Sequence, residues 1–117
     1  MKAILLVSHG SRSPKTKQEV HRLVKTLKQK SKIKIFEYAF LEIEQPGIPE
    51  GIDLCVQKGA GEITLLLNFL NSGRHVDQDI PAIIAESRKR YPRIPIKITK
   101  PVGQQEGIVD LFLGMIE

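Results

Sequence analysis

The chain has 117 residues, 41% of them hydrophobic and 26% charged, a composition typical of a globular domain that excludes a disordered segment. At this length we expect one domain over residues 1–117 whose core needs neither disulfides nor a structural metal, and no apolar run reaches the roughly 20 residues of a membrane helix. The formal net charge of +5 favours an acidic partner, either nucleic acid or a polyanionic small molecule.

The N-terminal segment predicts a buried strand over residues 2–7, where one Lys is followed by a continuous apolar run. This run is too short for a secretory signal and lacks a small-residue cleavage site after it. The single cysteine, Cys55, permits no internal disulfide and is expected to be a small buried hydrophobe. We therefore expect a cytoplasmic protein.

The first helix is predicted over residues 14–30, because Ser13 suits an N-cap and Pro14 suits the first helical position. Its apolar residues recur at helical spacing, at Val20, Leu23, Val24 and Leu27. A second strand is predicted over residues 33–40, where charged and apolar residues alternate at the start.

A loop with two prolines and a glycine is expected at residues 42–49. A short helix follows it to about Lys58, where Gly59 ends it. The most strongly apolar run of the chain predicts a third strand over residues 62–69, and a polar loop is expected at 71–78.

The third helix is expected to open with the Asp-Ile-Pro of residues 79–81 and to end at Tyr91. A fourth strand is predicted over residues 93–99, and Pro95 within it indicates an edge position. The final helix is predicted over residues 105–116.

Four strands that alternate with four helices predict an α/β fold, a three-layer domain with a four-stranded parallel sheet and helices on both faces. Because crossover connections are right-handed, the simplest strand order is 2-1-3-4. This order places a topological switch point between the first and third strands, and ligands of such sheets bind beyond the carboxyl ends of the strands there.

The residues that follow the strands suit metal chemistry. His9 follows the first strand, Glu42 the second and His75 the third, so we expect the three side chains to meet at one edge of the sheet. Imidazole is the commonest transition-metal ligand and accepts protons near neutral pH. The sequence therefore predicts a metal site at this edge, although a purely solvated role for Glu42 stays open.

Neighbouring residues have separate interpretations. Gly10 and Gly73 lie beside the two strand-end histidines and let the backbone approach a flat ligand. His21 lies inside the first helix and is expected to be structural or solvated. Asp79 is interpreted as a charge at a helix N-terminus that the helix dipole stabilises.

Three motifs contain these residues: LVSHGS at residues 6–11, AFLE at 39–42 followed by Pro46 and IPE at 48–50, and G-x-H-x-x-x-D-I-P at 73–81. In order and spacing they resemble the small sirohydrochlorin chelatases, the class II chelatase family of cobalt and iron insertion. The resemblance covers residues 3–85, and the C-terminal third agrees in pattern only.

The resemblance implies a chelatase-like fold and an enzyme, a sirohydrochlorin metal chelatase of the lyase class. It implies that His9 and His75 handle the metal and that Glu42 assists as ligand or proton acceptor. No permanently bound cofactor is expected, because the divalent metal, cobalt(II), iron(II) or nickel(II), is a substrate for cobalamin, siroheme or nickel tetrapyrrole synthesis.

The expected partners are sirohydrochlorin, the metal ion and a second copy of the chain, since the short family members pair as homodimers; neither nucleic acid nor membrane is expected. Sirohydrochlorin is fringed with carboxylates, for which Arg12 and Arg74 are the best candidates. The full set expected to contact the substrate is Ser8, Gly10, Ser11, Arg12, Gly73 and Arg74.

Three other functions remain open from the residues alone. The first is a flavodoxin- or receiver-like module that binds a phosphate or nucleotide at residues 8–13, ahead of a helix, although the loop lacks a full phosphate-binding glycine pattern. The second is an accessory chelatase half without activity. The third, a nucleic-acid-binding domain, rests on charge alone.

Overall fold

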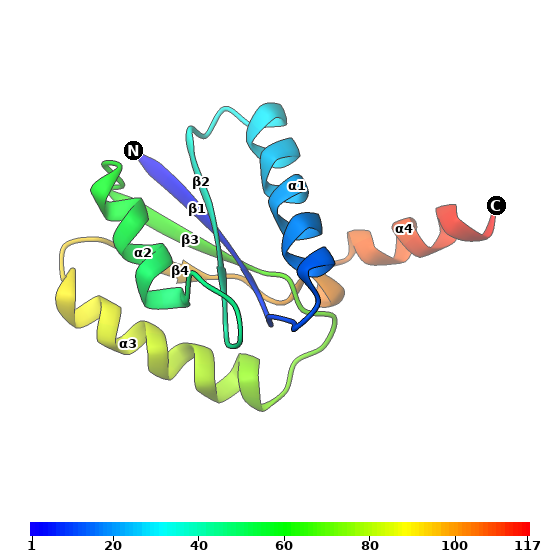
Figure 1. Cartoon of the computed structure of the whole chain (residues 1–117). Coiled ribbons are helices and arrows are strands. Elements are labelled where there is room, and N and C mark those ends of the chain that lie inside the picture. The colour runs from blue at the N-terminus through cyan, green and yellow to red at the C-terminus, as the bar shows by residue number, and fades with distance from the viewer.

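Four strands form one parallel sheet in the computed structural model, which describes residues 1–117 (Figure 1). The strands are β1 (Lys2–Ser8), β2 (Ile35–Phe40), β3 (Glu62–Leu67) and β4 (Ile96–Ile98). Their order across the sheet is β2-β1-β3-β4. Because β1 pairs with β2 on one side and with β3 on the other, the carboxyl ends of these three strands lie side by side.

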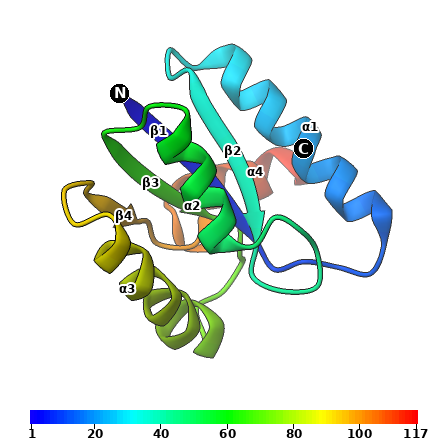
Figure 2. The same cartoon turned by 60° about the vertical axis from the view of Figure 1, so that its left-hand side comes forward.

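The two faces of the sheet carry different numbers of helices. One face is covered by α1 (Pro14–Lys30), and the other by α2 (Ile48–Gln57) and α3 (Ile80–Arg90) (Figure 2). A fourth helix, α4 (Gly107–Ile116), extends away from the sheet (Figure 1). Two short helical turns, η1 (His75–Asp79) and η2 (Val102–Gln104), precede α3 and α4. None of the helices combines the length and the apolar character that crossing a membrane requires.

The period-two alternation of β1 explains the two core layers. Its Leu5 packs with the residues of α2 and α3, whereas Ile4 packs with Val20 and Val24 of α1. A strand covered on both faces must be apolar along its whole length, which is why residues 3–7 form an unbroken apolar run. Each such fully buried aliphatic side chain stabilises the fold by about 1.5–3 kcal/mol.

Close packing and one polar cluster hold α2 in place. A Cβ at Gly51 would lie 2.9 Å from Leu5 Cδ1, so only glycine lets α2 approach the sheet this closely. At the other side of α2, Asp53 Oδ1 accepts hydrogen bonds from Arg90 Nη2 and the Tyr91 hydroxyl, each at 2.7 Å. Partial burial acts to raise the pKa of Asp53, but these two bonds outweigh it and hold that pKa below its usual value, so the carboxylate that joins α2 to α3 is charged at neutral pH.

The predicted fold class and the strand order 2-1-3-4 are confirmed. The fourth strand lies at the edge, as predicted, but its predicted extent is wrong, because only Ile96–Ile98 pair with β3. Pro95 has no N–H for a ladder bond and stands just before the strand. The second strand begins at Ile35 rather than at residue 33.

Helical structure also begins earlier than the sequence predicts. The loop expected at residues 71–78 ends at Arg74, since η1 starts at His75 and runs directly into α3. The loop expected at 42–49 ends at Gly47, because proline fits the first turn of α2. The final helix is the exception: it begins at Gly107, later than the predicted residue 105, and, against expectation, covers neither face of the sheet.

Cys55 allows a direct test of the core. The residue has no exposed surface, and this burial, together with the nearby Glu37 carboxylate, raises the pKa of its thiol to about 12. At about pH 8 the folded protein therefore keeps a protonated, inaccessible thiol. We expect no reaction with dithionitrobenzoate in native buffer and one equivalent of reaction in denaturing urea, followed by absorbance. Rapid reaction of the native protein would contradict this packing.

Candidate metal site

The segments that follow β1 and β2 remain paired beyond the strands. Leu41 N–H donates to Ser8 O at 2.8 Å, and Glu42 N–H donates to His9 O at 3.1 Å. Gly10 follows with a φ of 104°, and a Cβ at this position would lie 1.8 Å from Glu42 O. Only glycine permits both this φ and this approach, so the placement of Glu42 against His9 depends on Gly10.

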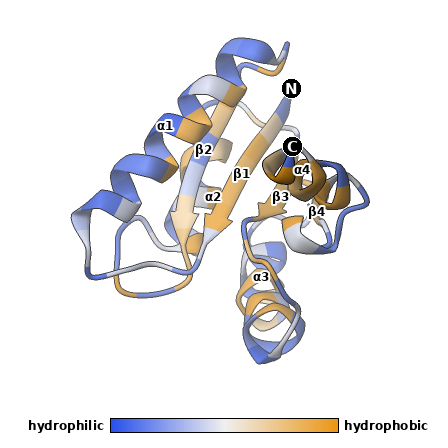
Figure 3. Ribbon diagram, turned by 90° about the vertical axis from the view of Figure 1, so that its right-hand side faces the viewer, coloured by the Kyte–Doolittle hydropathy of each residue, from blue (hydrophilic) through white to orange (hydrophobic).

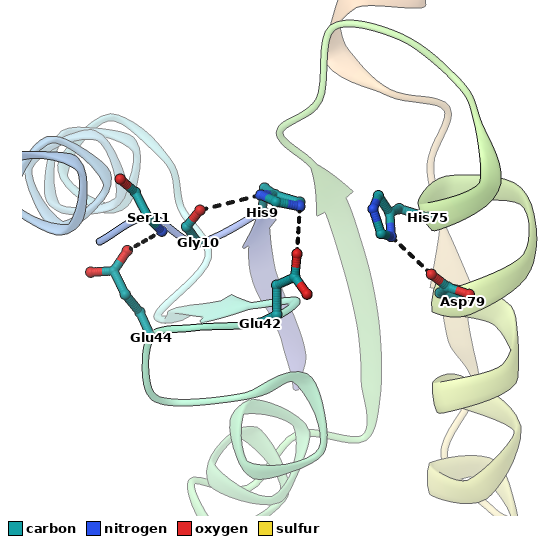
Figure 4. A network of polar contacts seen from close by, with 7 residues as sticks. All are labelled: His9, Gly10, Ser11, Glu42, Glu44, His75 and Asp79. Atoms are coloured by element: carbon teal, nitrogen blue, oxygen red, sulfur yellow. Dashed lines mark hydrogen bonds and ion pairs between the residues drawn. The ribbon is translucent and has the colours of Figure 1, made fainter. Parts of the chain in front are cut away.

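This pairing brings a carboxylate to an imidazole. Glu42 Oε1 lies 2.9 Å from His9 Nε2, and the Gly10 carbonyl oxygen lies 3.2 Å from His9 Nδ1 (Figure 4). The side chains of His9 and Glu42 are 45% and 51% exposed, so each reaches solvent and an incoming ligand. Both ring nitrogens of His9 thus lie beside oxygen atoms, and Nε2 is the one that shares the open rim with a carboxylate.

The second imidazole is oriented by its own helix. Asp79 stands four residues after His75 at the end of η1, and Asp79 Oδ2 lies 2.8 Å from His75 Nδ1 (Figure 4). A proton on Nδ1 then donates to the carboxylate, which leaves the lone pair of Nε2 for a metal. The sequence predicts only a helix-terminal charge at Asp79, so this role of the carboxylate is new. The signal for the carboxylate–histidine pair was its i,i+4 spacing.

The two imidazoles face each other across the strand ends (Figure 4). Their ring centroids are 5.2 Å apart, with an angle of 59° between the planes. His9, Glu42 and His75 each offer one ligand atom, and these atoms lie within 4.8 Å of one another. Two ligands bound tetrahedrally to one ion at about 2.1 Å lie about 3.4 Å apart, so these half-exposed side chains would have to move closer together to share one cation. The structure thus brings together the three strand-end residues that the sequence singled out.

The remaining predicted site residues do not all face the rings. Ser8 is 4% exposed and its Oγ accepts a hydrogen bond from Asn68 Nδ2 at 3.0 Å, so it joins the ends of β1 and β3 beneath the site. Gly73 lies in an open loop, with space around the position of a Cβ. Arg12 and Arg74 are exposed, and neither forms an ion pair within the chain.

The loop ahead of α1 is poorly suited to a phosphate. Ser11 N–H donates to Glu44 Oε1 at 2.9 Å, and Ser13 N–H donates to the Ser11 hydroxyl oxygen at 3.0 Å. These amides are therefore occupied, and a carboxylate lies where a phosphate would have to approach. The arrangement argues against the flavodoxin- or receiver-like alternative.

The candidate site lies on an open rim of the protein. None of the cavities of the structure is lined by His9 or His75. The largest, about 690 Å³, runs along α1 and includes His21, which packs edge-on against Tyr38 at 5.9 Å between ring centroids. A single chain therefore presents its candidate metal ligands on a surface rather than in an enclosing pocket.

The structure is thus a parallel α/β domain with two imidazoles and a carboxylate gathered at its exposed strand ends, where open sheets of this class bind their ligands. The sequence matches the CbiX family over residues 3–117, and the chain belongs to that family. The resemblance read from its motifs is thereby confirmed at the level of the family.

Individual relatives agree with this assignment. The chain is 35% identical to the chloroplastic sirohydrochlorin ferrochelatase of Arabidopsis thaliana, over 97% of the chain and 51% of that protein. It is 36% identical to the sirohydrochlorin ferrochelatase of Bacillus subtilis, over 92% of the chain and 41% of that protein. The chain thus spans about half the length of these curated relatives.

A solved structure confirms the fold. The sirohydrochlorin chelatase SirB from Bacillus subtilis subspecies spizizenii, crystallised in complex with cobalt, superposes with a TM-score of 0.88 at 36% identity. The match covers 98% of this chain and 49% of SirB. The chain therefore corresponds to one half of that protein.

The role of Gly10 leads to a matched pair of variants. Gly10→Ala drives a Cβ into the Glu42 carbonyl, so we expect His9 and Glu42 to separate and cobalt(II) affinity to fall by about 10-fold or more. Gly59→Ala is the control, because Gly59 has a similar φ of 101° but nothing within 4 Å. Calorimetric titration of both folded variants checks this, and equal affinities would contradict it.

The carboxylate of Asp79 leads to a second test. Asp79→Asn removes the acceptor that orients His75, and we expect metal affinity to fall about 10- to 100-fold. Asp77→Asn, an exposed change in the same turn, is the control and should bind as the unaltered chain does. The visible spectrum of bound cobalt(II) reports the ligand geometry, and an unchanged spectrum and affinity in Asp79→Asn would argue against the positioning role.

Proposed function

We propose that the chain inserts a divalent metal ion into sirohydrochlorin, as a chelatase of the lyase class. The observation that carries this proposal is the convergence of His9, Glu42 and His75 within 4.8 Å at the open strand ends of a CbiX-family chain. The names of its relatives, sirohydrochlorin ferrochelatases and a sirohydrochlorin chelatase complexed with cobalt, support the choice of substrate.

The metal is held loosely before transfer. Two imidazoles and one carboxylate supply fewer protein ligands than the four of a closed structural site, and all three side chains are about half exposed. An ion bound in this way exchanges water readily and leaves for a stronger set of ligands, the four nitrogens of the tetrapyrrole. Asp79 keeps the metal-binding nitrogen of His75 directed at the site.

Insertion also moves protons. One divalent cation enters the ring and two pyrrole N–H protons leave, so the charges balance. As the metal passes to the ring nitrogens, the imidazole of His9 and the carboxylate of Glu42 are released 2.9 Å apart and are placed to accept those protons. The same groups thus serve first as ligands and then as bases.

The loops around the site supply the contacts with the substrate. Arg12 and Arg74 are exposed, flank the histidines and are unpaired within the chain, which suits them to the carboxylates of sirohydrochlorin. A flat ring can come close to the backbone at Gly10 and Gly73, because neither residue has a side chain. Ser11, next to Gly10, lies in the same loop. Ser8, expected to contact the substrate, is instead buried and supports the site from beneath through its bond to Asn68.

The assembly and setting form part of the same proposal. Because the ligands lie on an open rim, one chain does not enclose a tetrapyrrole, and we propose that a second copy completes the site as a homodimer. The metal is cobalt(II), iron(II) or nickel(II), consumed as a substrate with no resident cofactor, in cobalamin or siroheme synthesis. The single cysteine favours a cytoplasmic location.

Histidine variants test the proposal. His9→Ala and His75→Ala each remove a metal ligand and should lower the insertion rate by at least about 100-fold, a loss of about 2.7 kcal/mol of transition-state stabilisation. His21→Ala is the control, since His21 lies on α1 away from the pair, and should insert at the rate of the unaltered chain. The absorbance change of sirohydrochlorin, followed separately with each metal, gives the rate.

Two results would contradict the proposal. Full activity of either strand-end histidine variant under limiting metal would remove those histidines from the reaction. Binding of sirohydrochlorin by the purified chain without insertion of any of the three metals would instead identify an accessory half.

A further inference from the structure

The last helix exposes an apolar surface on all sides. No residue of α4 is buried, and six large hydrophobic side chains on it are between 50 and 79% exposed. They are Val109, Leu111, Phe112, Leu113, Met115 and Ile116. Figure 3 shows α4 as the most uniformly hydrophobic helix of the chain. A helix that is apolar all round is stable in water only when another surface covers it.

The same protein contains an apolar groove without a helix in it. On the face of the sheet that α1 covers, α1 packs over β1 and β2 and leaves β3 partly exposed, with Thr64 and Leu66 half-buried on that face. A groove of about 420 Å³ lies there between α1, β3 and the segment after β4. Its apolar lining consists of Leu6, Leu23, Leu27, Leu66, Leu67 and Val102.

The helix and the strand beside the groove are similar in length, and the groove and the helix are both apolar. Ten residues of α4 span about 15 Å, and the six residues of β3 span about 20 Å. The opposite face of the sheet carries two helices, whereas this face carries one. A second helix over β3 completes the three layers that an open parallel sheet requires.

The chain directs α4 away from its own groove. Gly103 N–H donates to Phe69 O at 3.1 Å, and a Cβ at Gly103 would lie 1.9 Å from Leu70 O. The segment before α4 is therefore held against the loop that follows β3. Only Gln105 and Glu106 separate η2 from α4, and Gln105 Nε2 donates to Lys100 O. A connection this short and this tightly bound leaves little chain for a reversal.

We propose that two copies of the chain exchange their last helices, each α4 lying in the groove between α1 and β3 of the other copy. A short, fixed connection before a terminal element is the arrangement that favours such an exchange, because the helix finds its site on a neighbour more easily than on its own domain. The exchange is reciprocal, so it closes as a two-fold dimer and leaves no apolar helix exposed. It rests on the homodimer proposed above but not on the metal chemistry.

A charged substitution on α4 tests the contact. Phe112 is exposed in the single chain, so Phe112→Asp leaves the domain folded by circular dichroism while it places a charge in the groove of the partner. We expect light scattering to give the mass of two chains for the unaltered protein and of one chain for this variant. Asp110→Asn, an exposed polar position on the same helix, is the control and should remain a dimer.

Cross-linking tests the exchange itself. One tagged copy carries Leu23→Cys at the rim of the groove, and a co-expressed copy with another tag carries Leu113→Cys on α4. A short bismaleimide should join the two differently tagged chains, and neither variant alone should be joined to itself. Cys55 stays silent because it is fully buried.

Each outcome is decisive. A cross-link between the tags together with a dimer that Phe112→Asp dissociates supports the exchange. A dimer that survives Phe112→Asp and gives no cross-link keeps the pairing and overturns the exchange. A single-chain mass at all concentrations, with no cross-link between the tags, overturns both the dimer and the exchange.

Discussion

The close approach of Gly10 to the Glu42 carbonyl determines the geometry of the candidate site. Beyond the last paired residues of β1 and β2, backbone hydrogen bonds continue from His9 to Glu42, and a glycine with a φ of 104° lets the two segments touch. A side chain at this position would force them apart. The parallel sheet therefore brings the histidine and the carboxylate to the same edge, but the missing Cβ brings their side chains within 2.9 Å.

Two different constraints orient the two imidazoles. His9 is held between the Gly10 carbonyl and the Glu42 carboxylate, both supplied by neighbouring loops, whereas His75 is held by Asp79 on its own helix. All of these groups remain partly exposed, so water and a ligand compete for them. This combination of fixed direction and open access suits a site that passes a metal ion on, and it is poorly suited to one that retains the ion.

The position of α4 has a consequence for stability as well as for assembly. A domain of this size buries a modest core, here divided into two clusters by the sheet, and it cannot leave a fully apolar helix in water without loss. Covering β3 and α4 together removes both exposed surfaces at once. Assembly would thereby complete the hydrophobic core, while the candidate metal ligands stay beyond Ser8 and Leu67, at the carboxyl ends of β1 and β3.

The sequence by itself determined most of the framework. Apolar runs and helical spacing predicted the strands and helices, and the handedness of crossovers predicted the order that brings His9, Glu42 and His75 to one edge. Only the tertiary structure decided which atoms meet. The i,i+4 spacing allowed a bond between Asp79 and His75, but only the structure shows that it forms, and only the structure shows the bond of Ser8 to Asn68, 60 residues away. The hydrophobic pattern of a helix such as α4 shows that its apolar surface must be covered, but not which surface covers it. The pattern shows only which residues share a face of one helix or strand, whereas the packing partner is set by the tertiary structure.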